Sequence, residues 1–352
     1  MIAAGREGMR FGSRYGGRME YRILGKTGIK VSAIGLGSWP IGELIGGVIG
    51  ESVKRIPKGW AGAVDEESIR TIRRAEELGV NLLHSSKIYG GGHAESIVGL
   101  ATRGRRDKWV ISTKVRGFYT DEADIPHTRK RIIEACEGSL RRLQSDYIDL
   151  YMLHSRPHPE TLQAAMETLT QLKREGKIRW SGVSTTAIDG IEGLKKAMNF
   201  GEVAGMVVGY NMVHRGSEAM LQFARDNNIG TMIASPLASG VLSGHWFDKL
   251  PELDPLDTRY RAFYGDRART ETAFRKFSEL HFLATGGKRT VAQAALRFII
   301  DTPGVTAVIP GALRVAELEE NAGAASVPPL TAEERAKGAA IAEEGDRIWR
   351  GK

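Results

Sequence analysis

The fold is decided by residues 148–183, which read IDLYMLHSRPHPETLQAAMETLTQLKREGKIRWSGV. Apolar runs at 148–153 and 178–183 have the composition of strands that are buried on both faces. Between them, residues 162–172 carry apolar side chains at helical spacing. A strand, a helix and a second strand in this order predict a right-handed βαβ unit with parallel strands.

The same alternation extends to both sides of this unit. Eight apolar runs are candidate strands, each followed by a helical segment: 33–37, 80–83, 109–113, 148–153, 178–183, 205–208, 230–234 and 305–309. Eight such repeats predict an α/β protein, a closed (β/α)8 or TIM barrel, rather than an open sheet. No Gly-x-Gly-x-x-Gly sequence follows the first run, which argues against a Rossmann fold. A capping box at Thr331–Glu334 predicts one further helix at the end.

Composition narrows the class of protein. The chain has 352 residues, of which 41% are hydrophobic and 26% charged, as in ordinary folded domains. No apolar run reaches the roughly 18 residues of a membrane span, so no membrane role is expected. The single cysteine, Cys136, excludes internal disulfides and Cys-based zinc sites, which favours a reducing, cytoplasmic compartment. Cys136 lies on an apolar helix face, where a core role is expected.

The net charge of +8 is concentrated partly in a Gly- and Arg-rich leader at residues 1–20. Two interpretations are open: a basic arm that binds nucleic acid or acidic lipid, or a flexible segment without a partner. The density of glycine favours the second, so nucleic-acid binding is not expected. Residues 21–352 then form a single barrel domain with long loops at about 41–62 and 238–268.

Polar residues gather where the predicted strands end. His84, Lys87 and Tyr89 follow the second strand, Lys114 follows the third, and His154 follows the fourth. Active sites of such barrels lie at the C-terminal ends of the strands, so these side chains predict a proton-transfer site. A buried ammonium beside a phenol lowers the phenol pKa, and we therefore expect Tyr89 to titrate nearer neutrality.

Ordered motifs reveal a family resemblance from Tyr21 to about Ala325. They are Arg22–Gly28, Ile34–Trp39, Asp65–Ile69, Gly79–Asn81, Ser112–Lys114, Tyr147–Leu150, Gly182–Ser184, Ser235–Leu237 and Ile309–Gly311. In this order they resemble the aldo-keto reductase superfamily. The resemblance implies a (β/α)8 barrel that reduces carbonyl groups with NADPH.

The catalytic tetrad of that family is Asp, Tyr, Lys and His. The resemblance assigns Tyr89 as proton donor, Lys114 as the lysine that tunes it and His154 as the histidine facing the substrate carbonyl. The aspartate position is occupied by His84. Loss of this negative charge should lower the pKa of Lys114 and support a tyrosinate at Tyr89. A shift from general acid towards general base, with an anionic substrate or enolate, is the resulting hypothesis.

The resemblance also implies a cofactor site and departures from it. The implied contacts with NADPH are Ser184, Thr185, Ser235, Leu237, Gly240, Arg314, Glu320 and Asn321. Five positions differ from the family's usual residues: Thr185 for Asn, Val207 for Gln, Ala234 for an aromatic residue, His245 for Lys and Glu317 for Arg or Gln. Proton-transfer groups are thus retained better than the residues that hold the nicotinamide.

Three functions are therefore open. The first is NADPH-dependent reduction of a small polar, sugar-like or cyclic carbonyl substrate. The second is a redox-neutral isomerase, lyase or dehydratase that uses Tyr89, Lys114 and His154, and the third is a non-catalytic binding subunit. Trp39, Trp60 and Lys87 are the expected substrate-pocket residues. No ligand spacing for a metal is present, so no metal is expected, and the sequence does not indicate an oligomeric state.

Overall fold

A parallel sheet of eight short strands forms the centre of the molecule. The structure is a computed structural model that describes residues 19–42, 59–115, 128–155, 157 and 161–351. The strands are β3 (Leu36–Gly37), β4 (Leu82–His84), β5 (Val110–Val115), β6 (Ile148–Leu153), β7 (Ile178–Ser184), β8 (Gly205–Gly209), β9 (Gly230–Ala234) and β10 (Ala307–Val308). Each pairs in parallel with its neighbour in sequence, from β3 to β10.

The first and last strands join and close the sheet. Parallel bridges connect Ile34 with Val308 and Gly37 with Gly311. The Gly35 N–H donates to the Val308 carbonyl over 2.8 Å, and the Val308 N–H donates to the Ala33 carbonyl over 2.8 Å. The predicted closed (β/α)8 barrel is therefore confirmed.

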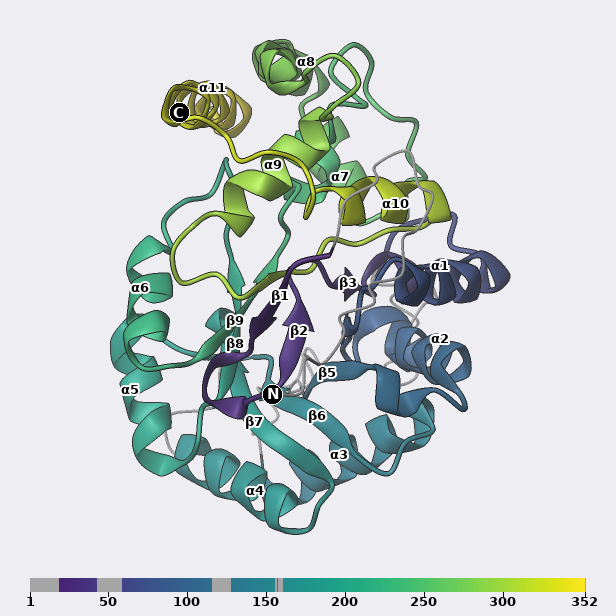
Figure 1. Cartoon of the computed structure of the whole chain (residues 1–352), viewed down its shortest axis with the longest axis vertical. Helices are drawn as coiled ribbons and strands as arrows, with labels where there is room; N and C mark the ends of the chain where they lie inside the picture. The colour runs from purple at the N-terminus through teal and green to yellow at the C-terminus, as the bar shows by residue number, and fades with distance from the viewer. Residues whose placement is uncertain (1–18, 43–58, 116–127, 156, 158–160, 352) are drawn as a thin grey trace, which may run out of the picture.

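Eight helices follow the eight strands in turn and surround the barrel (Figure 1). They are α1 (Asp65–Glu77), α2 (His93–Thr102), α3 (Arg129–Leu143), α4 (Leu162–Arg174), α5 (Gly190–Phe200), α6 (Glu218–Asp226), α9 (Val291–Ile300) and α10 (Val315–Gly323). Helix α3 buries Cys136, as expected of a core residue. The helices cover the outer face of the barrel.

Three further helices lie outside the repeat. They are α7 (Tyr260–Tyr264), α8 (Arg267–Ser278) and α11 (Ala332–Arg350), and α11 begins at the predicted capping box of Thr331 and Glu334. Helices α8 and α11 lie side by side (Figure 1), joined by an ion pair of 2.7 Å between Lys276 and Glu344. The long loop predicted at about 238–268 contains two short helical segments, a 3-10 turn at Ala238–Ser243 and α7.

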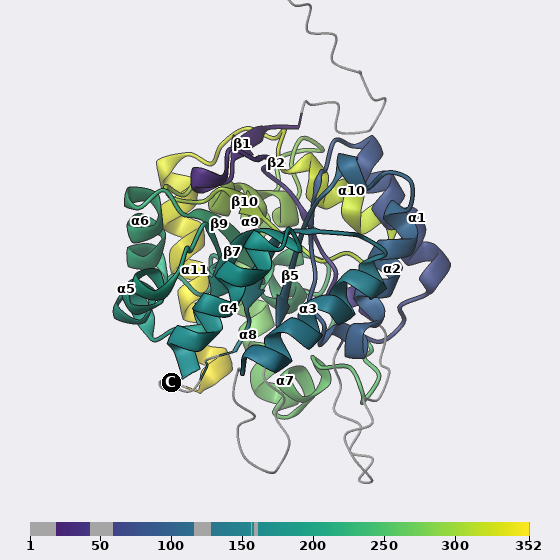
Figure 2. The same ribbon diagram turned by 90° about the horizontal axis from the view of Figure 1, so that it is seen from below.

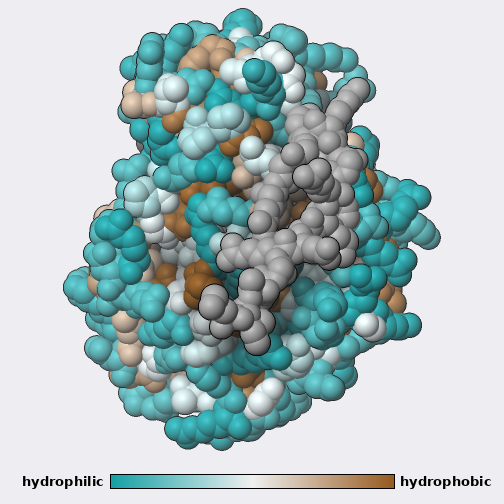
Figure 3. Space-filling model, viewed as in Figure 1, coloured by the Kyte–Doolittle hydropathy of each residue, from teal (hydrophilic) through white to brown (hydrophobic). Residues whose placement is uncertain are grey.

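A β-hairpin covers the N-terminal end of the barrel. Its strands are β1 (Tyr21–Ile23) and β2 (Lys30–Ser32), and Leu24 and Val31 pack into the barrel interior. Figure 2 shows this hairpin at one end of the molecule and α7 at the opposite end. The face seen in Figure 3 is mostly hydrophilic, with hydrophobic residues only in small separate areas. The hairpin covers the N-terminal end, and the predicted site residues follow the strands at the opposite end.

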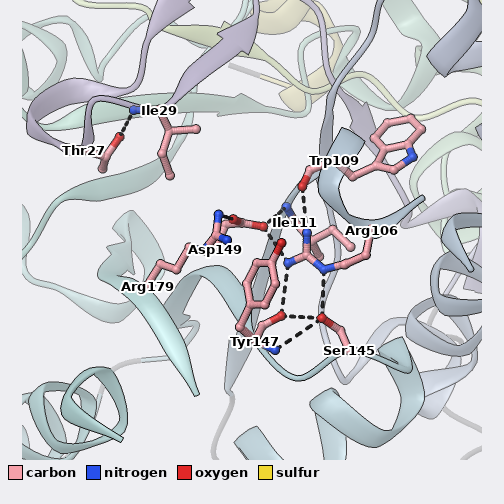
Figure 4. Close-up of polar contacts among 9 residues, drawn as sticks. All are labelled: Thr27, Ile29, Arg106, Trp109, Ile111, Ser145, Tyr147, Asp149 and Arg179. Atoms are coloured by element: carbon pink, nitrogen blue, oxygen red, sulfur yellow. Dashed lines mark hydrogen bonds and ion pairs between the residues drawn. The ribbon is translucent and has the colours of Figure 1, made fainter. Parts of the chain in front are cut away.

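Buried charge at the N-terminal end is fully paired (Figure 4). The Asp149 carboxylate, near the start of β6, accepts hydrogen bonds from Arg106 over 2.6 Å, from the Ile111 N–H over 2.9 Å and from Arg179 over 3.0 Å. The two guanidinium groups lie 4.1 and 3.9 Å from the ring centre of Tyr147. The paired charges at this end stabilise the fold, because active sites of such barrels lie at the opposite end, where the strands terminate.

Two sequence expectations fall largely outside the described residues. The predicted leader at 1–20 includes residues 1–18, and the predicted loop at 41–62 includes residues 43–58. Within the ranges that the structure describes, no helix is both long and apolar enough to cross a membrane.

Candidate active site

Strand alternation places three predicted site residues inside the barrel. Leu82, Val110 and Leu150 belong to the interior cluster, and side chains two residues further on point the same way. His84 therefore points inward at the end of β4, Lys114 near the end of β5 and His154 directly after β6. The strands end later than expected, at His84 and Val115, so His84 and Lys114 lie within them.

Lys114 is held by two neutral groups. Its ammonium nitrogen lies 2.7 Å from the Tyr89 hydroxyl and 2.7 Å from His84 Nε2. His84 is paired in register with Ser112, and its Nδ1 lies 3.2 Å from the Ser112 hydroxyl. Because Lys114 stands two residues beyond Ser112, one imidazole reaches both side chains. A proton on Nδ1 for Ser112 leaves Nε2 to accept from Lys114.

Burial controls the charge of this pair. Lys114 and His84 are each only 2% exposed. Burial lowers the pKa of Lys114 to about 7, and burial together with the Lys114 charge holds the pKa of His84 well below 6.5. The expected fall in the Lys114 pKa is confirmed in direction. No ion pair joins Lys114 to a carboxylate within the part of the chain that the structure describes.

Tyr89 reaches Lys114 from a glycine-rich turn, Tyr89–Gly92. At Gly90, with φ of 55°, a Cβ would collide with the Gly42 carbonyl, so the close approach of the turn at Pro40–Gly42 requires glycine there. The Trp39 ring contacts Tyr89 edge to face, with centroids 4.9 Å apart. Burial raises the pKa of Tyr89 above its ordinary value of 10, so the expected shift towards neutrality is wrong.

The reason for this correction is desolvation. The phenol is buried, and removal from water disfavours the phenolate more than one adjacent lysine favours it. Burial also disfavours the ammonium form of Lys114, so this lysine stabilises a phenolate at Tyr89 less than the sequence suggested. Tyr89 therefore carries its proton at neutral pH.

His154 completes the group of proton-transfer side chains. Its Nδ1 lies 3.1 Å from the Ser86 hydroxyl, and its ring stands nearly perpendicular to that of Tyr89, with centroids 6.3 Å apart. The Thr186 hydroxyl donates to the His154 carbonyl and lies 2.9 Å from Ser184 Oγ. The structure thus brings Tyr89, Lys114, His84 and His154 together as predicted.

Of the three expected substrate-pocket residues, the structure brings only Trp39 against Tyr89. Trp60 instead stacks on the guanidinium of Arg259, at 4.0 Å, and Arg259 pairs with the buried Asp257 over 2.8 Å. Lys87 is half-buried. The charges that act on its ammonium come from α2 and α3: Arg142, Glu95 and Arg131. The place of Lys87 in a substrate pocket stays a prediction.

The loop after β9 has an unusual backbone. Ser235, Ala238 and Ser239 have positive φ although they are not glycine, and Gly240 has φ of 97°. The Ala238 and Gly240 N–H groups donate to the Ser235 and Leu237 carbonyls, over 3.0 and 2.9 Å, so the loop is a tight turn. A Cβ at Gly240 would collide with the Trp246 indole, so glycine is required here. The predicted cofactor residues Ser235, Leu237 and Gly240 thus lie in one loop, residues 235–244, which we call the phosphate loop after the role that the resemblance implies.

The remaining predicted cofactor residues occupy two places. Ser184 ends β7, and Thr185 follows it half-buried, while Val207 and Ala234 line the same interior with apolar side chains. Arg314 stands before α10, and Glu320 and Asn321 lie within it. The Asn321 amide donates to the Gly311 carbonyl over 3.3 Å. The first place is the C-terminal end of β7, with Ser184 and Thr185. The second is helix α10, with Arg314, Glu320 and Asn321.

Sequence reasoning missed the hydroxyl groups that support the site. Ser112 holds His84, Ser86 holds His154, and the Ser38 hydroxyl donates to Ser85 over 2.8 Å. The sequence signal that could have identified Ser112 is its two-residue spacing from Lys114, which places both side chains on the same face of one strand. Among the described residues, no group of three or more His, Cys, Asp or Glu side chains could hold a metal ion.

Comparison with known proteins identifies the family. The model of the "Aldo/keto reductase family" matches residues 53–343. The "Aldo-keto reductase YhdN" of Bacillus subtilis (strain 168) is 32% identical over 307 residues, which cover 86% of this chain and 87% of that protein.

Solved structures agree with this match. The holo form of aldo-keto reductase AKR11C1 from Bacillus halodurans is 26% identical, with a TM-score of 0.71 over 92% of this chain and 96% of that one. An aldo/keto reductase from Klebsiella pneumoniae, solved in complex with NADP and acetate, is 27% identical, with a TM-score of 0.64 over 91% and 95% of the two chains. This chain belongs to the aldo/keto reductase family.

Proposed function

We propose that this protein reduces the carbonyl group of a small polar substrate, with Tyr89 as the proton donor. The observation that carries the proposal is a protonated phenol held 2.7 Å from the Lys114 ammonium nitrogen at the strand ends. A reduced nicotinamide dinucleotide supplies the hydride when it is bound. NADPH is the form expected from the sequence, and the Klebsiella relative was solved with NADP.

The proton chemistry follows from burial. The raised pKa of Tyr89 keeps its hydroxyl protonated, as a general acid requires. When the proton leaves, negative charge develops on the phenol oxygen, where the Lys114 ammonium donates a charge-assisted hydrogen bond. Reduction therefore needs Lys114 in its protonated form.

His84 acts as a positioning residue. Its Nε2 lies 2.7 Å from Lys114, and its Nδ1 is held by Ser112, so the imidazole directs the ammonium towards Tyr89. Unlike a carboxylate, a neutral imidazole adds no negative charge to the pair. The ammonium is thus less stable than in a site with Asp, and its charge is available to the phenolate that forms.

The dinucleotide fits two features of this chain. The phosphate loop would lie along its phosphates, as the resemblance implies, and Ser184 lies at the strand end where the resemblance expects the carboxamide of the nicotinamide. His154 and Trp39 flank the Tyr89 ring and would orient the substrate carbonyl. An aromatic wall of this kind suits a cyclic or sugar-like substrate.

A redox-neutral reaction is the second candidate. It is favoured by Val207 and Ala234, whose apolar side chains offer no hydrogen bond to a nicotinamide. Such an isomerase, lyase or dehydratase would use Tyr89, Lys114 and His154 without hydride transfer. Since Tyr89 keeps its proton, its role there would also be that of an acid.

Nucleotide binding and turnover test the proposal together. Fluorescence titration should show micromolar binding of a reduced nicotinamide dinucleotide, and its absorbance at 340 nm should fall on addition of an aldehyde or ketone from a substrate panel. Tyr89→Phe should retain binding but lose about 10²- to 10⁴-fold in kcat, because only the proton donor is removed. Unchanged kcat in Tyr89→Phe would contradict the role of Tyr89, and absence of binding at millimolar nucleotide would favour the redox-neutral reaction.

A further inference from the structure

The phosphate loop and helix α10 are joined at their edges. His245, directly after the phosphate loop, places Nε2 3.0 Å from a carboxylate oxygen of Glu320 in α10. Burial alone would raise the pKa of Glu320, but hydrogen bonds from His245 and Thr290 lower it, so the carboxylate is ionised. A dinucleotide with its nicotinamide at the strand ends and its phosphates on the loop would therefore place its adenosine half beside α10.

The start of α10 is occupied by carboxylates of the chain itself. Glu317 accepts a hydrogen bond from the Leu313 N–H over 2.8 Å, so its side chain folds back over the first turn. Glu67 of α1 accepts from the Val315 N–H over 3.1 Å. Hydrogen bonds from Arg70 and Val315 lower the pKa of Glu67, which is therefore ionised as well. Donors that attract a phosphate elsewhere are here already engaged with negative groups.

The positive charge of Arg314 does not outweigh the negative charge of the carboxylates at the start of α10. Arg314 precedes α10 with an exposed side chain, and its charge acts on the Glu67 carboxylate. The charge of Glu317 also reaches His245, whose pKa is raised mainly by Glu320 and further by Glu317. The positive charge of His245, at the end of the phosphate loop, is thus balanced by the acidic side chains of α10.

These charges discriminate between two cofactors that differ only at the adenosine ribose. A carboxylate accepts a hydrogen bond from a ribose 2′-hydroxyl, whereas a 2′-phosphate calls for arginine or lysine and is repelled by a carboxylate. We propose that Glu317 makes this protein select NAD(H), which has the free 2′-hydroxyl, over NADP(H). The inference rests on the proposed function and names its cofactor more narrowly than the resemblance did.

Calorimetric binding of NADH and NADPH to the purified full chain, without substrate, tests this selection. The wild type should bind NADH at least about tenfold more tightly than NADPH, which corresponds to about 1.4 kcal/mol. Glu317→Gln should reduce that ratio about tenfold by improving the affinity for NADPH. Glu319→Gln is the matched control, because it removes the same charge from the same helix at a residue that pairs with Arg74 of α1, over 2.8 Å.

The outcomes separate the selection from the proposed function. Tighter binding of NADPH than of NADH by the wild type would overturn the selection while leaving the reductase proposal intact. Equal effects of Glu317→Gln and Glu319→Gln on the ratio would overturn the role of Glu317. Binding of neither nucleotide at millimolar concentration would overturn both proposals.

Discussion

The two ends of the barrel treat buried charge in opposite ways. At the N-terminal end, the Asp149 carboxylate has two arginine partners and a backbone donor (Figure 4). At the C-terminal end, on the neighbouring strand, the described residues within hydrogen-bond distance of the Lys114 ammonium are the neutral Tyr89 and His84. The negative charge of Asp149 is balanced by partners within the fold. The positive charge of Lys114 has no counter-ion among the described residues, so it can stabilise the phenolate that forms in the proposed reaction.

This difference separates stability from function. A buried charge with all its partners in place holds neighbouring segments in register, and removing one partner is costly. A buried charge without a counter-ion destabilises the folded chain and shifts its own pKa towards neutrality, as at functional sites. The sign of the stability change on mutation should therefore differ between the two ends.

The largest effect is expected at the paired end. Asp149→Asn should lower the free energy of unfolding by about 3 kcal/mol, because Arg106 and Arg179 lose their shared carboxylate. Urea unfolding would measure it. The exposed neighbour Asp146, changed to Asn, is the control and should shift stability by less than about 0.5 kcal/mol. A small effect of Asp149→Asn would remove the contrast between the two ends.

The opposite sign is expected at Lys114. Its folded pKa of about 7 lies below the 10.5 of the unfolded chain, so the unfolded state binds more protons between these values. Stability therefore rises with pH from about 7 to 10.5, and the full penalty is present below 7. Lys114→Met should stabilise the protein by about 2 kcal/mol at pH 6.5, with the gain vanishing towards pH 10.5. Urea unfolding at both pH values would show it, and destabilisation at pH 6.5 would contradict the uncompensated charge.

A smaller effect is expected from giving Lys114 the carboxylate that it lacks. Reduction by the wild type should slow as the pH rises through about 7, because the ammonium that supports the phenolate is lost there. His84→Asp should move this limb of the pH–rate profile upward by at least about one unit, or about 1.4 kcal/mol. His84→Asn, which adds no charge, is the control. Equal profiles for the two variants would show that charge at residue 84 does not set the Lys114 pKa.

Much of this architecture could be predicted because it follows from local patterns. Runs such as 148–153 and 178–183 are apolar on both faces, which specifies parallel strands covered by helices. Tyr89, Lys114, His84 and His154 were predicted as one site because the ends of parallel strands meet at one end of a barrel. Trp60 and Lys87 stay predicted substrate-pocket residues, and their contacts with Arg259 and with the charges of α2 and α3 could not be predicted because those groups lie elsewhere in the sequence.

The pKa of Tyr89 shows why charge required the tertiary structure. The sequence identifies a phenol and an ammonium as neighbours, and that pair alone predicts a lowered phenol pKa. Desolvation opposes this effect, and its size depends on how completely Trp39, the turn at Pro40–Gly42 and the barrel wall enclose the ring. No local pattern in the sequence contains that information.

The sequence by itself determined the family, the barrel and the identity of the proton-transfer groups, since periodicity and ordered motifs survive without knowledge of contacts. Only the tertiary structure decided which charges are compensated. It pairs Asp149 with Arg106 and Arg179, leaves Lys114 with two neutral partners, and folds Glu317 back over the start of α10. Electrostatic energy depends on distance and burial, and both are set by residues that lie far apart in the chain.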